Sequence, residues 1–519
     1  MSGHKGIENI IKYRSLIGMG LVSLLAVIYT IKAVSVNSTT DPYMKICLLI
    51  SCLCLCGSGL SYRILLKEEI LWERVFLSIG AVFGICIMLM VPVGAAPDEV
   101  YHTTVAYSVA GRIMGYQADE GKEYVREIET KTELQEKAIR REYYDTYFPR
   151  LKETGVSSKM VKQRYSHNSE VPHMIYLPAA LGIVIGRLLG LGLVGTLLLG
   201  RFINLLVYLL AGYFAIRLTP VGKNLLVLVM CLPMTLQEAS AISSDSPIFS
   251  MAFLFIGLSL SYMMGEKDIL ASKAKLLLYF LLALILSSCK YGACLPIVLF
   301  GLLIVMRRRE KKTRYIALGV VIAASLLGFL PSIIRVFSSD VLTNQGVVNY
   351  SAGYVLTHPY EMMLLLGNSF NWHMDRFYYS IIGTALGWFE LYIPYHIGIM
   401  MILLLFLSMI RGKKTLSMDE TAEADGRFSL IERLFMIFVM LLGLAMAIGG
   451  MLVGHTPMGS AAVEGVQGRY VTPYIFPFLM ALLPERLGYQ DEEDAHRKLG
   501  MLFVCVYVLA ICCLFLRTR

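Results

Sequence analysis

Charged side chains are scarce in this 519-residue sequence, because Asp, Glu, Lys and Arg together make up 16% of it. A typical soluble domain has about 25%. Hydrophobic residues make up 56%, and long apolar runs recur along the chain. This balance excludes a soluble multidomain enzyme and predicts one polytopic membrane protein. The net charge of +9 is gathered in a few short loops, which is typical of membrane orientation rather than of nucleic-acid binding.

Cysteine is missing from the longest polar stretch, residues 95–173, although the chain holds 11 cysteines. All of them lie within or beside apolar segments, so we predict neither a disulfide framework nor a cysteine-ligated zinc site. The close set Cys52, Cys54 and Cys56 would splay around a helix axis. We interpret these three as packing or lipid-facing side chains.

Thirteen apolar runs are predicted to cross the membrane, because a span needs about 20 mostly apolar residues. They are residues 16–33, 44–62, 75–95, 196–216, 222–238, 245–264, 275–290, 292–306, 315–333, 393–411, 429–453, 470–485 and 500–516. The expected fold is therefore an all-α polytopic membrane protein. We expect N-terminal membrane helices in residues 1–95, an external loop with amphipathic and surface helices in 96–195, and a C-terminal helix bundle in 196–519.

Basic loops set the expected orientation, because loops rich in Lys and Arg stay in the cytoplasm. The most basic loop, residues 307–314, carries six cations, and with thirteen spans it lies on the same side as the other basic loops. The N-terminus is then cytoplasmic, and residues 16–33 form an anchor rather than a cleaved signal peptide. This agreement requires residues 174–192 to lie at the membrane surface without crossing it.

The first external loop is long and highly charged, with 13 acidic and 12 basic side chains in residues 95–173. Residues 119–142 interleave Glu with Lys and Arg at helical spacing, as in Glu133 and Lys137. This pattern is typical of a solvated amphipathic helix held by weak ion pairs one turn apart. A cap over an active site at the membrane surface is the functional alternative.

Two carboxylates, Asp98 and Glu99, follow the third apolar run. Pro97 suits the first position of a helix, which would place both acids in the first turn and His102 one turn after Asp98. Acids at a helix start also stabilise the helix dipole without any catalytic duty, so a purely structural role stays open. Carboxylates at a membrane boundary are nevertheless costly unless they are solvated or used.

Two further polar motifs stand where external loops meet apolar runs. Ser243, Ser244 and Asp245 precede a span and would serve equally well as a helix cap. Within residues 465–470, two glycines allow close backbone approach to a ligand, and Arg469 offers a two-pronged donor for a phosphate. Contact of this arginine with lipid headgroups is the alternative.

Other polar side chains are expected on the same side of the membrane as these motifs. They are Arg201, Lys290, Tyr291, Glu390, Gln467 and Tyr470. Seven histidines also fall in external segments, but no pair has a tight ligand spacing. A histidine metal site is therefore not favoured.

Four stretches together resemble a bacterial family of uncharacterised polytopic membrane proteins, domain of unknown function 2142. These stretches are Pro97-Asp98-Glu99 with His102, Lys290-Tyr291, Gly387-Trp388 up to Pro394 after His358-Pro359, and residues 465–470. They extend from residue 97 to about 485. Val100 stands where the family usually has proline, and Glu390 where it usually has Asp.

That family is similar to the polyprenyl-phosphate-dependent glycosyltransferases of the C-type superfold (GT-C). The resemblance implies an inverting transfer of a hexose or pentose to a glycan or lipid acceptor, on the external face of the plasma membrane, in cell-envelope polysaccharide biosynthesis. It implies a catalytic set of Asp98, Glu99 and His102, with Asp98 as general base. The expected substrate-binding residues are Asp245, Lys290, Tyr291, Glu390, Gln467, Arg469, Tyr470 and Arg201. Glu99 is also the expected ligand of a divalent cation, Mg²⁺ or Mn²⁺.

Three other functions stay open. A transporter or flippase of lipid-linked sugar would need polar residues near the bilayer midplane and interrupted helices, whereas the charges here lie at span ends. A non-catalytic assembly partner in surface-polysaccharide export would tolerate replacement of Asp98. A polymerase or ligase of undecaprenyl-linked glycans would use a diphosphate-linked oligosaccharide donor.

Overall fold

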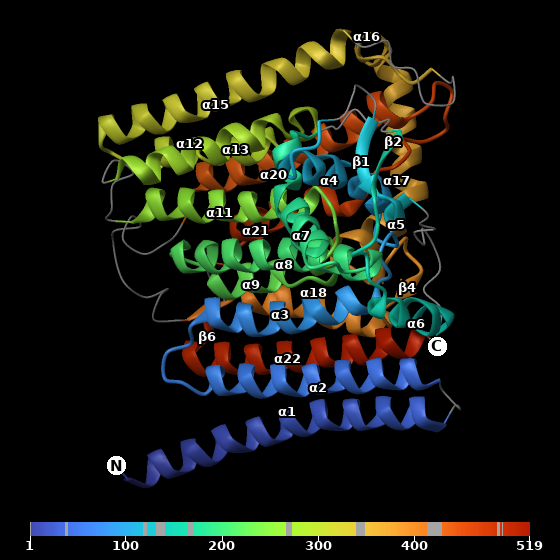
Figure 1. The fold of residues 1–519 in the computed structure, drawn as a ribbon. Helices are drawn as coiled ribbons and strands as arrows, with labels where there is room; N and C mark the ends of the chain where they lie inside the picture. The colour runs from blue at the N-terminus through green and yellow to red at the C-terminus, as the bar shows by residue number, and fades with distance from the viewer. Residues whose placement is uncertain are drawn as a thin grey trace.

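The computed structural model describes residues 2–36, 40–117, 122–130, 141–164, 171–265, 272–338, 348–412, 428–484, 488–489 and 491–518. The protein is an all-α polytopic membrane protein in which long helices run nearly parallel through most of the molecule (Figure 1). Large apolar side chains on the outside of these helices, such as Leu210 and Phe214, are exposed. Such exposure is expected where lipid rather than water is the solvent.

Nine helices in the described residues are long and apolar enough to cross a membrane, and each corresponds to one predicted span. They are α1 (Ser2–Val36), α2 (Asp41–Leu65), α3 (Trp72–Met90), α8 (Leu193–Leu218), α11 (Asp245–Met264), α12 (Lys273–Ser288), α15 (Lys311–Ser338), α20 (Leu430–His455) and α22 (Glu492–Arg517).

The other four predicted spans are shorter or broken helices, so the count of thirteen stays a prediction. They become α9 (Lys223–Met230) with α10 (Pro233–Ala239), α13 (Leu295–Leu299) with α14 (Leu302–Arg307), α18 (Tyr395–Ser408) and α21 (Thr472–Ala481). Apolar composition predicted a continuous helix at residues 222–238. The break comes before Pro233, which lacks a backbone N–H and disfavours helical geometry in the residue before it.

The long polar loop folds against one end of the bundle (Figure 1). It contains α4 (Glu99–Ile113), α5 (Glu127–Thr130), α6 (Arg141–Tyr147), the 3₁₀ turn η1 (Phe148–Lys152), and strands β1 (Lys122–Arg126) and β2 (Met160–Arg164), which pair antiparallel. The predicted helix over 119–142 is wrong for β1, where Glu123 and Val125 alternate into the interior with strand periodicity. Glu133 and Lys137 lie outside the described residues.

The stretch predicted to stay at the membrane surface forms η2 (His173–Tyr176) and α7 (Leu177–Leu188). At about 1.5 Å per residue, α7 is about 18 Å long, short of the ~30 Å hydrocarbon core. Both of its ends are tied to the polar loop. Tyr176 contacts His102, and Arg187 pairs with Glu129 at 2.7 Å. The helix is therefore short for a crossing segment, and its place at the membrane surface stays a prediction.

Helix α17 (Pro359–Ile382), which follows α16 (Ala352–Thr357), runs across the end of the bundle rather than along the spans (Figure 1). It ends at Ile382, and Gly383 with a left-handed φ of 84° leads into strands β3 (Ala385–Leu386) and β4 (Leu391–Tyr392), which pair antiparallel. The 3₁₀ turn η5 (Gly468–Val471) packs on α17. Segments far apart in sequence therefore meet at one end of the bundle.

Candidate functional site

Arg469 is the centre of a buried charged cluster at this end. Its Nη2 donates a hydrogen bond to Asp98 Oδ2 at 2.8 Å, and its Nη1 lies 3.0 Å from Glu238 Oε1. Its Nε lies 3.6 Å from Asp245 Oδ2, and its side chain is 2% exposed. Burial alone would lower the pKa of Arg469, but the neighbouring acids, led by Glu238, raise it well above its ordinary value. The arginine therefore stays charged although it is desolvated.

Lys290 brings a second cation into the cluster. Its Nζ forms an ion pair with Asp245 Oδ1 and lies 4.6 Å from the ring centroid of Tyr470, within the range of a cation–π contact. Lys290 and Tyr291 lie in the turn η4 (Cys289–Gly292) with left-handed φ values of 51°. This turn interrupts the helical backbone between α12 and α13, and the Lys290 side chain reaches Asp245.

Asp98 joins the cluster to a cavity of about 290 Å³. The cavity is lined by Gly94, Asp98, Glu99, Val100, Tyr101, Thr104 and Trp388. The Asp98 side chain is 44% exposed, whereas those of Glu238 and Asp245 are 0% and 3% exposed. Of the three acids around Arg469, Asp98 is thus the one that reaches solvent.

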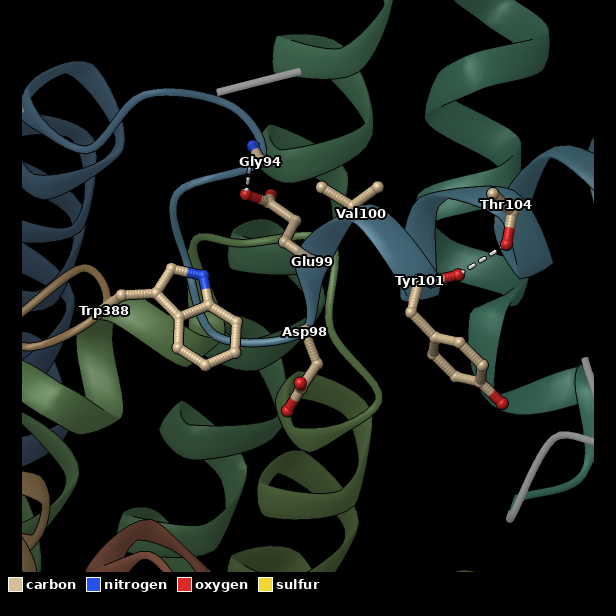
Figure 2. A pocket seen from close by; sticks show the side chains of 7 residues that line it. All are labelled: Gly94, Asp98, Glu99, Val100, Tyr101, Thr104 and Trp388. Carbon is tan, nitrogen blue, oxygen red and sulfur yellow. Dashed lines mark hydrogen bonds between the residues drawn. The ribbon is translucent and has the colours of Figure 1, made fainter. Parts of the chain in front are cut away.

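Asp98 and Glu99 point in opposite directions, although they are neighbours in the chain (Figure 2). The prediction placed both in the first helical turn, but α4 begins at Glu99, and Asp98 precedes it with φ 60° and ψ 9°. Pro97 is accordingly outside the helix. This left-handed residue turns the Asp98 carboxylate toward Arg469, while Glu99 faces the protein interior.

Glu99 is fully buried, and its partners favour a structural role. Arg201 donates to both of its oxygens, with Nε at 2.7 Å from Oε1. The backbone N–H groups of Gly94 and Ile242 donate to the same carboxylate at 2.7 and 2.9 Å. These four hydrogen bonds favour a structural role for Glu99, and its expected catalytic role and its binding of a cation stay predictions. Arg201, which was predicted to bind substrate, is buried and forms an ion pair with Glu99.

His102 was expected to hydrogen-bond Asp98, but its Nδ1 lies 2.7 Å from the hydroxyl of Tyr176. Burial lowers the pKa of His102 to about 4, although Asp98 and Asp245 act in the opposite direction. The ring is therefore neutral near pH 7. A neutral imidazole beside the cluster adds no positive charge to it.

The pH dependence of stability tests this burial. An unfolded chain protonates His102 near pH 6.5, whereas the folded protein does so only near pH 4. The stability that depends on neutral His102 is therefore complete above pH 6.5 and is lost as the pH falls toward 4. We expect the melting temperature to fall over this window less steeply in His102→Gln than in the wild type. Exposed His358→Gln is the control, and identical pH profiles for both variants would refute the assignment.

Residues with strained, left-handed backbone conformations lie in or near the charged cluster and the cavity. Among the described residues other than glycine, φ is positive at Asp98, Lys290, Tyr291 and Phe389. Each of these conformations costs about 1–2 kcal/mol in an L-residue. They persist where surrounding structure imposes them, which is typical of functional sites. Three of the four lie in the charged cluster or next to it in the chain, and Phe389 follows the cavity residue Trp388.

Close backbone contacts fix the segments that carry Arg469 and Trp388. The Gly468 N–H donates to Ser380 Oγ of α17 at 2.6 Å, and a Cβ at this glycine would lie 2.4 Å from the Phe377 carbonyl oxygen. Gln237 Oε1 accepts a hydrogen bond from the Gly387 N–H at 2.6 Å. Helix α10 thereby positions the turn whose Trp388 lines the cavity.

The structure brings together Asp98, Asp245, Lys290, Arg469 and Tyr470, all of which were expected on one side of the membrane. Other predicted residues lie elsewhere in the arrangement. Glu390 is exposed in the turn after Trp388, Gln467 precedes η5 with its Oε1 buried, and Tyr291 follows Lys290.

Glu238 belongs to the charged cluster but was not among the residues predicted from the sequence. It is the last residue of the predicted span 222–238, where an acid is typical of the end of a span. The polar pair Gln237 and Glu238 after Pro233 is unusual inside an apolar run, and it could have identified Glu238 as a candidate. Ser243 Oγ donates to Glu238 at 3.0 Å and accepts from the Asp245 N–H at 3.0 Å, so it links both acids.

A resident metal ion does not fit the acids that are present. In the part of the chain that the structure describes, no group of three His, Cys, Asp or Glu side chains is arranged to hold one. Asp98, Glu238 and Asp245 each face a different nitrogen of Arg469. The guanidinium therefore takes the central position that a cation would need.

One family model, described as a predicted membrane protein (DUF2142), matches residues 81–481. This range includes all the residues of the charged cluster. No curated protein and no solved structure matches the chain significantly.

Proposed function

The chain belongs to the DUF2142 family of predicted membrane proteins, and we propose that it is a membrane-embedded glycosyltransferase. It moves a sugar from a polyprenyl-phosphate donor to a cell-surface glycan or lipid acceptor at the plasma membrane. The observation that carries this proposal is a solvent-reaching carboxylate, Asp98, at the edge of a cavity and beside two cations, the buried Arg469 and the half-buried Lys290. The proposed base, Asp98, and the two cations that would bind phosphate, Arg469 and Lys290, therefore belong to one site.

The chemistry is an inverting displacement at the anomeric carbon. The hydroxyl oxygen of the acceptor bonds to that carbon, and Asp98 accepts the hydroxyl proton as this bond forms. The bond from the carbon to the phosphate oxygen breaks, and the lipid phosphate leaves with the electron pair. Arg469 and Lys290 stabilise the negative charge of the leaving group.

Cavity size favours a single sugar over an oligosaccharide. A volume of about 290 Å³ lies at the lower limit of small-molecule sites. The Trp388 indole forms one wall, and a flat aromatic surface suits the apolar face of a sugar ring. This argues against a polymerase or ligase that accepts a diphosphate-linked oligosaccharide.

Helix α17 supports a site at the level of lipid phosphates. It crosses the bundle end, and exposes large apolar side chains that include Tyr360, Met363, Phe370 and Met374. A helix that lies across the spans with such a surface suits the membrane interface. Its last turns contact Gly468, so the interface helix adjoins Arg469.

A transporter of lipid-linked sugar is the second candidate. The broken helix pair α9 and α10 favours it, because discontinuous helices form substrate sites in transporters. Glu238 lies in α10 and contacts Arg469. A transporter would move the donor without breaking its glycosidic bond.

Sugar transfer by the purified protein separates the two candidates. The donor is a polyprenyl-phosphate sugar with a radiolabelled sugar, and the acceptor is an envelope glycan extract. Glycan analysis of a deletion strain then identifies which sugar disappears. We expect label in the acceptor and release of polyprenyl phosphate. Movement of intact donor across proteoliposomes without such release would favour the transporter.

We also propose that the cluster faces the cell exterior, with the N-terminus in the cytoplasm. Helix α15 begins at Lys311, shortly after the basic segment 307–309, and this end of α15 lies at the end of the bundle away from α16, α4 and α17 (Figure 1). In intact cells, an impermeant maleimide should label Ser157→Cys and spare Lys312→Cys, both of which are exposed positions. Cys52 and Cys56, which are exposed, are replaced by Ser in both variants. The reverse labelling pattern would overturn the orientation.

A further inference from the structure

We infer that Asp98 occupies the edge of Arg469 that a phosphate group binds, so that phosphate binding displaces Asp98 and releases it as the base. The phosphate is that of a lipid carrier if the proposed function holds. The exchange itself depends on the geometry of Arg469. It links donor binding to the availability of the base.

The first support is the unequal exposure of the three acids. Glu238 is held by Ser243, and Asp245 is held by Lys290. Both acids are almost completely buried, whereas the Asp98 side chain is 44% exposed. Asp98 is therefore the acid that can leave Arg469 without entering the protein interior.

The second support is the arrangement of donors on Arg469. Nη2 donates to Asp98, while the neighbouring Nε is buried and has no hydrogen-bond partner. Nε and Nη2 form one edge of the guanidinium, and two parallel donors match two oxygens of a phosphate. Departure of Asp98 would free Nη2 on this edge, and Asp245 Oδ2, at 3.6 Å from Nε, is too distant to form a hydrogen bond there. A phosphate would then satisfy the orphaned Nε, which Asp98 does not.

The third support is the charge of the cluster. Three carboxylates face two cations, so the ionised cluster carries one excess negative charge. A phosphate added to this arrangement would be repelled. Exchange of Asp98 for phosphate keeps the number of negative groups on Arg469 unchanged. It also leaves the carboxylate oxygens of Asp98 free to turn into the cavity. There they can accept the acceptor hydroxyl proton.

The test is calorimetric titration of the full-length protein with farnesyl phosphate, inorganic phosphate and farnesol. Two variants remove the competing carboxylate and suit the positive φ of residue 98: Asp98→Asn, because Asn tolerates this conformation, and Asp98→Gly. Asp375→Asn, exposed on α17, is the control for loss of one negative charge. Because two substitutions are compared, misfolding of one leaves the measurement intact.

We expect both Asp98 variants to bind farnesyl phosphate more tightly than the wild type. The gain for Asn should be about tenfold, since hydrogen bonds to a charged acceptor are roughly twice as strong as neutral ones. Asp375→Asn and farnesol should show no gain. A gain with inorganic phosphate as well would show that the phosphate alone displaces Asp98. A gain restricted to farnesyl phosphate would show that the lipid positions it.

Unchanged or weaker phosphate binding in both Asp98 variants would overturn the inference. The proposed function fails separately. Tighter binding without sugar transfer by the wild type would leave the exchange standing and refute the glycosyltransferase. Sugar transfer with no gain in affinity would do the opposite.

Discussion

Asp98→Asn should lower the turnover of sugar transfer by about 10²–10⁴, the usual effect of removing a general base. The substitution keeps the size of the side chain and its fit to a left-handed backbone. It removes the charge that accepts the hydroxyl proton. Because Asn competes less well for Arg469, the Michaelis constant for the donor should fall as turnover falls. A fall in both constants would show that the Asp98 carboxylate acts in turnover and also competes with the donor for Arg469 in the ground state.

The measurement is steady-state kinetics of purified Asp98→Asn, with its melting temperature determined in the same detergent. Asp375→Asn is the control and should retain wild-type turnover. A role for Asp98 in the helix dipole would predict lower stability by about 0.3–1 kcal/mol with turnover spared. The Asp98 side chain forms no capping hydrogen bond to α4, which argues against that role. Near-normal turnover at unchanged melting temperature would exclude Asp98 as the base.

Apolar composition was sufficient to predict the long spans but not the broken ones. A bilayer imposes a length and an apolar surface, and both are visible in the sequence. Helices α9 and α10 come from a largely apolar run, but they are buried inside the protein, where backbone breaks are tolerated because other segments cover them. Burial by protein rather than by lipid leaves little trace in hydropathy.

The chemistry-bearing residues were predictable as a set, whereas their pairing was not. Asp98, Asp245, Lys290 and Arg469 all fall at the same ends of their spans, which loop charge and span count reveal. Which neighbouring acid faces Arg469 depends on one backbone angle, the φ of 60° at Asp98. No spacing rule encodes that angle. Because of this angle, Glu99 pairs with Arg201 and Asp98 pairs with Arg469. The sequence predicted that the two acids act together, whereas each has its own partner.

Strand β1 shows a different limit of sequence reasoning. Its charges suggested a solvated helix, because charged side chains are rarely buried without partners. Glu123 is nevertheless 1% exposed, and both of its carboxylate oxygens lack a hydrogen-bond partner. Burial raises its pKa to about 8, so the side chain is protonated near pH 7. A neutral Glu of this kind cannot be recognised from a charge pattern.

Arg201→Met should destabilise the protein by about 3–5 kcal/mol, because it leaves the Glu99 carboxylate buried without its ionic partner. Arg201 also donates to the carbonyl oxygens of Val91 and Pro92, at 2.6 and 2.7 Å. These bonds hold the loop that precedes Asp98. We therefore expect a lower melting temperature and a loss of turnover that follows the loss of folded protein.

A double substitution and a control distinguish this role from the predicted one in substrate binding. Arg201→Met with Glu99→Leu removes both charges, but the backbone N–H groups of Gly94 and Ile242 then lack an acceptor. Each orphaned group costs about 1–3 kcal/mol, so the double variant should stay less stable than the wild type. Arg217→Met, at the exposed end of the same helix, should melt like the wild type. If Arg201→Met instead raised the Michaelis constant for the donor at an unchanged melting temperature, Arg201 would be a substrate ligand, and the buried pair would not be what holds Asp98 in place.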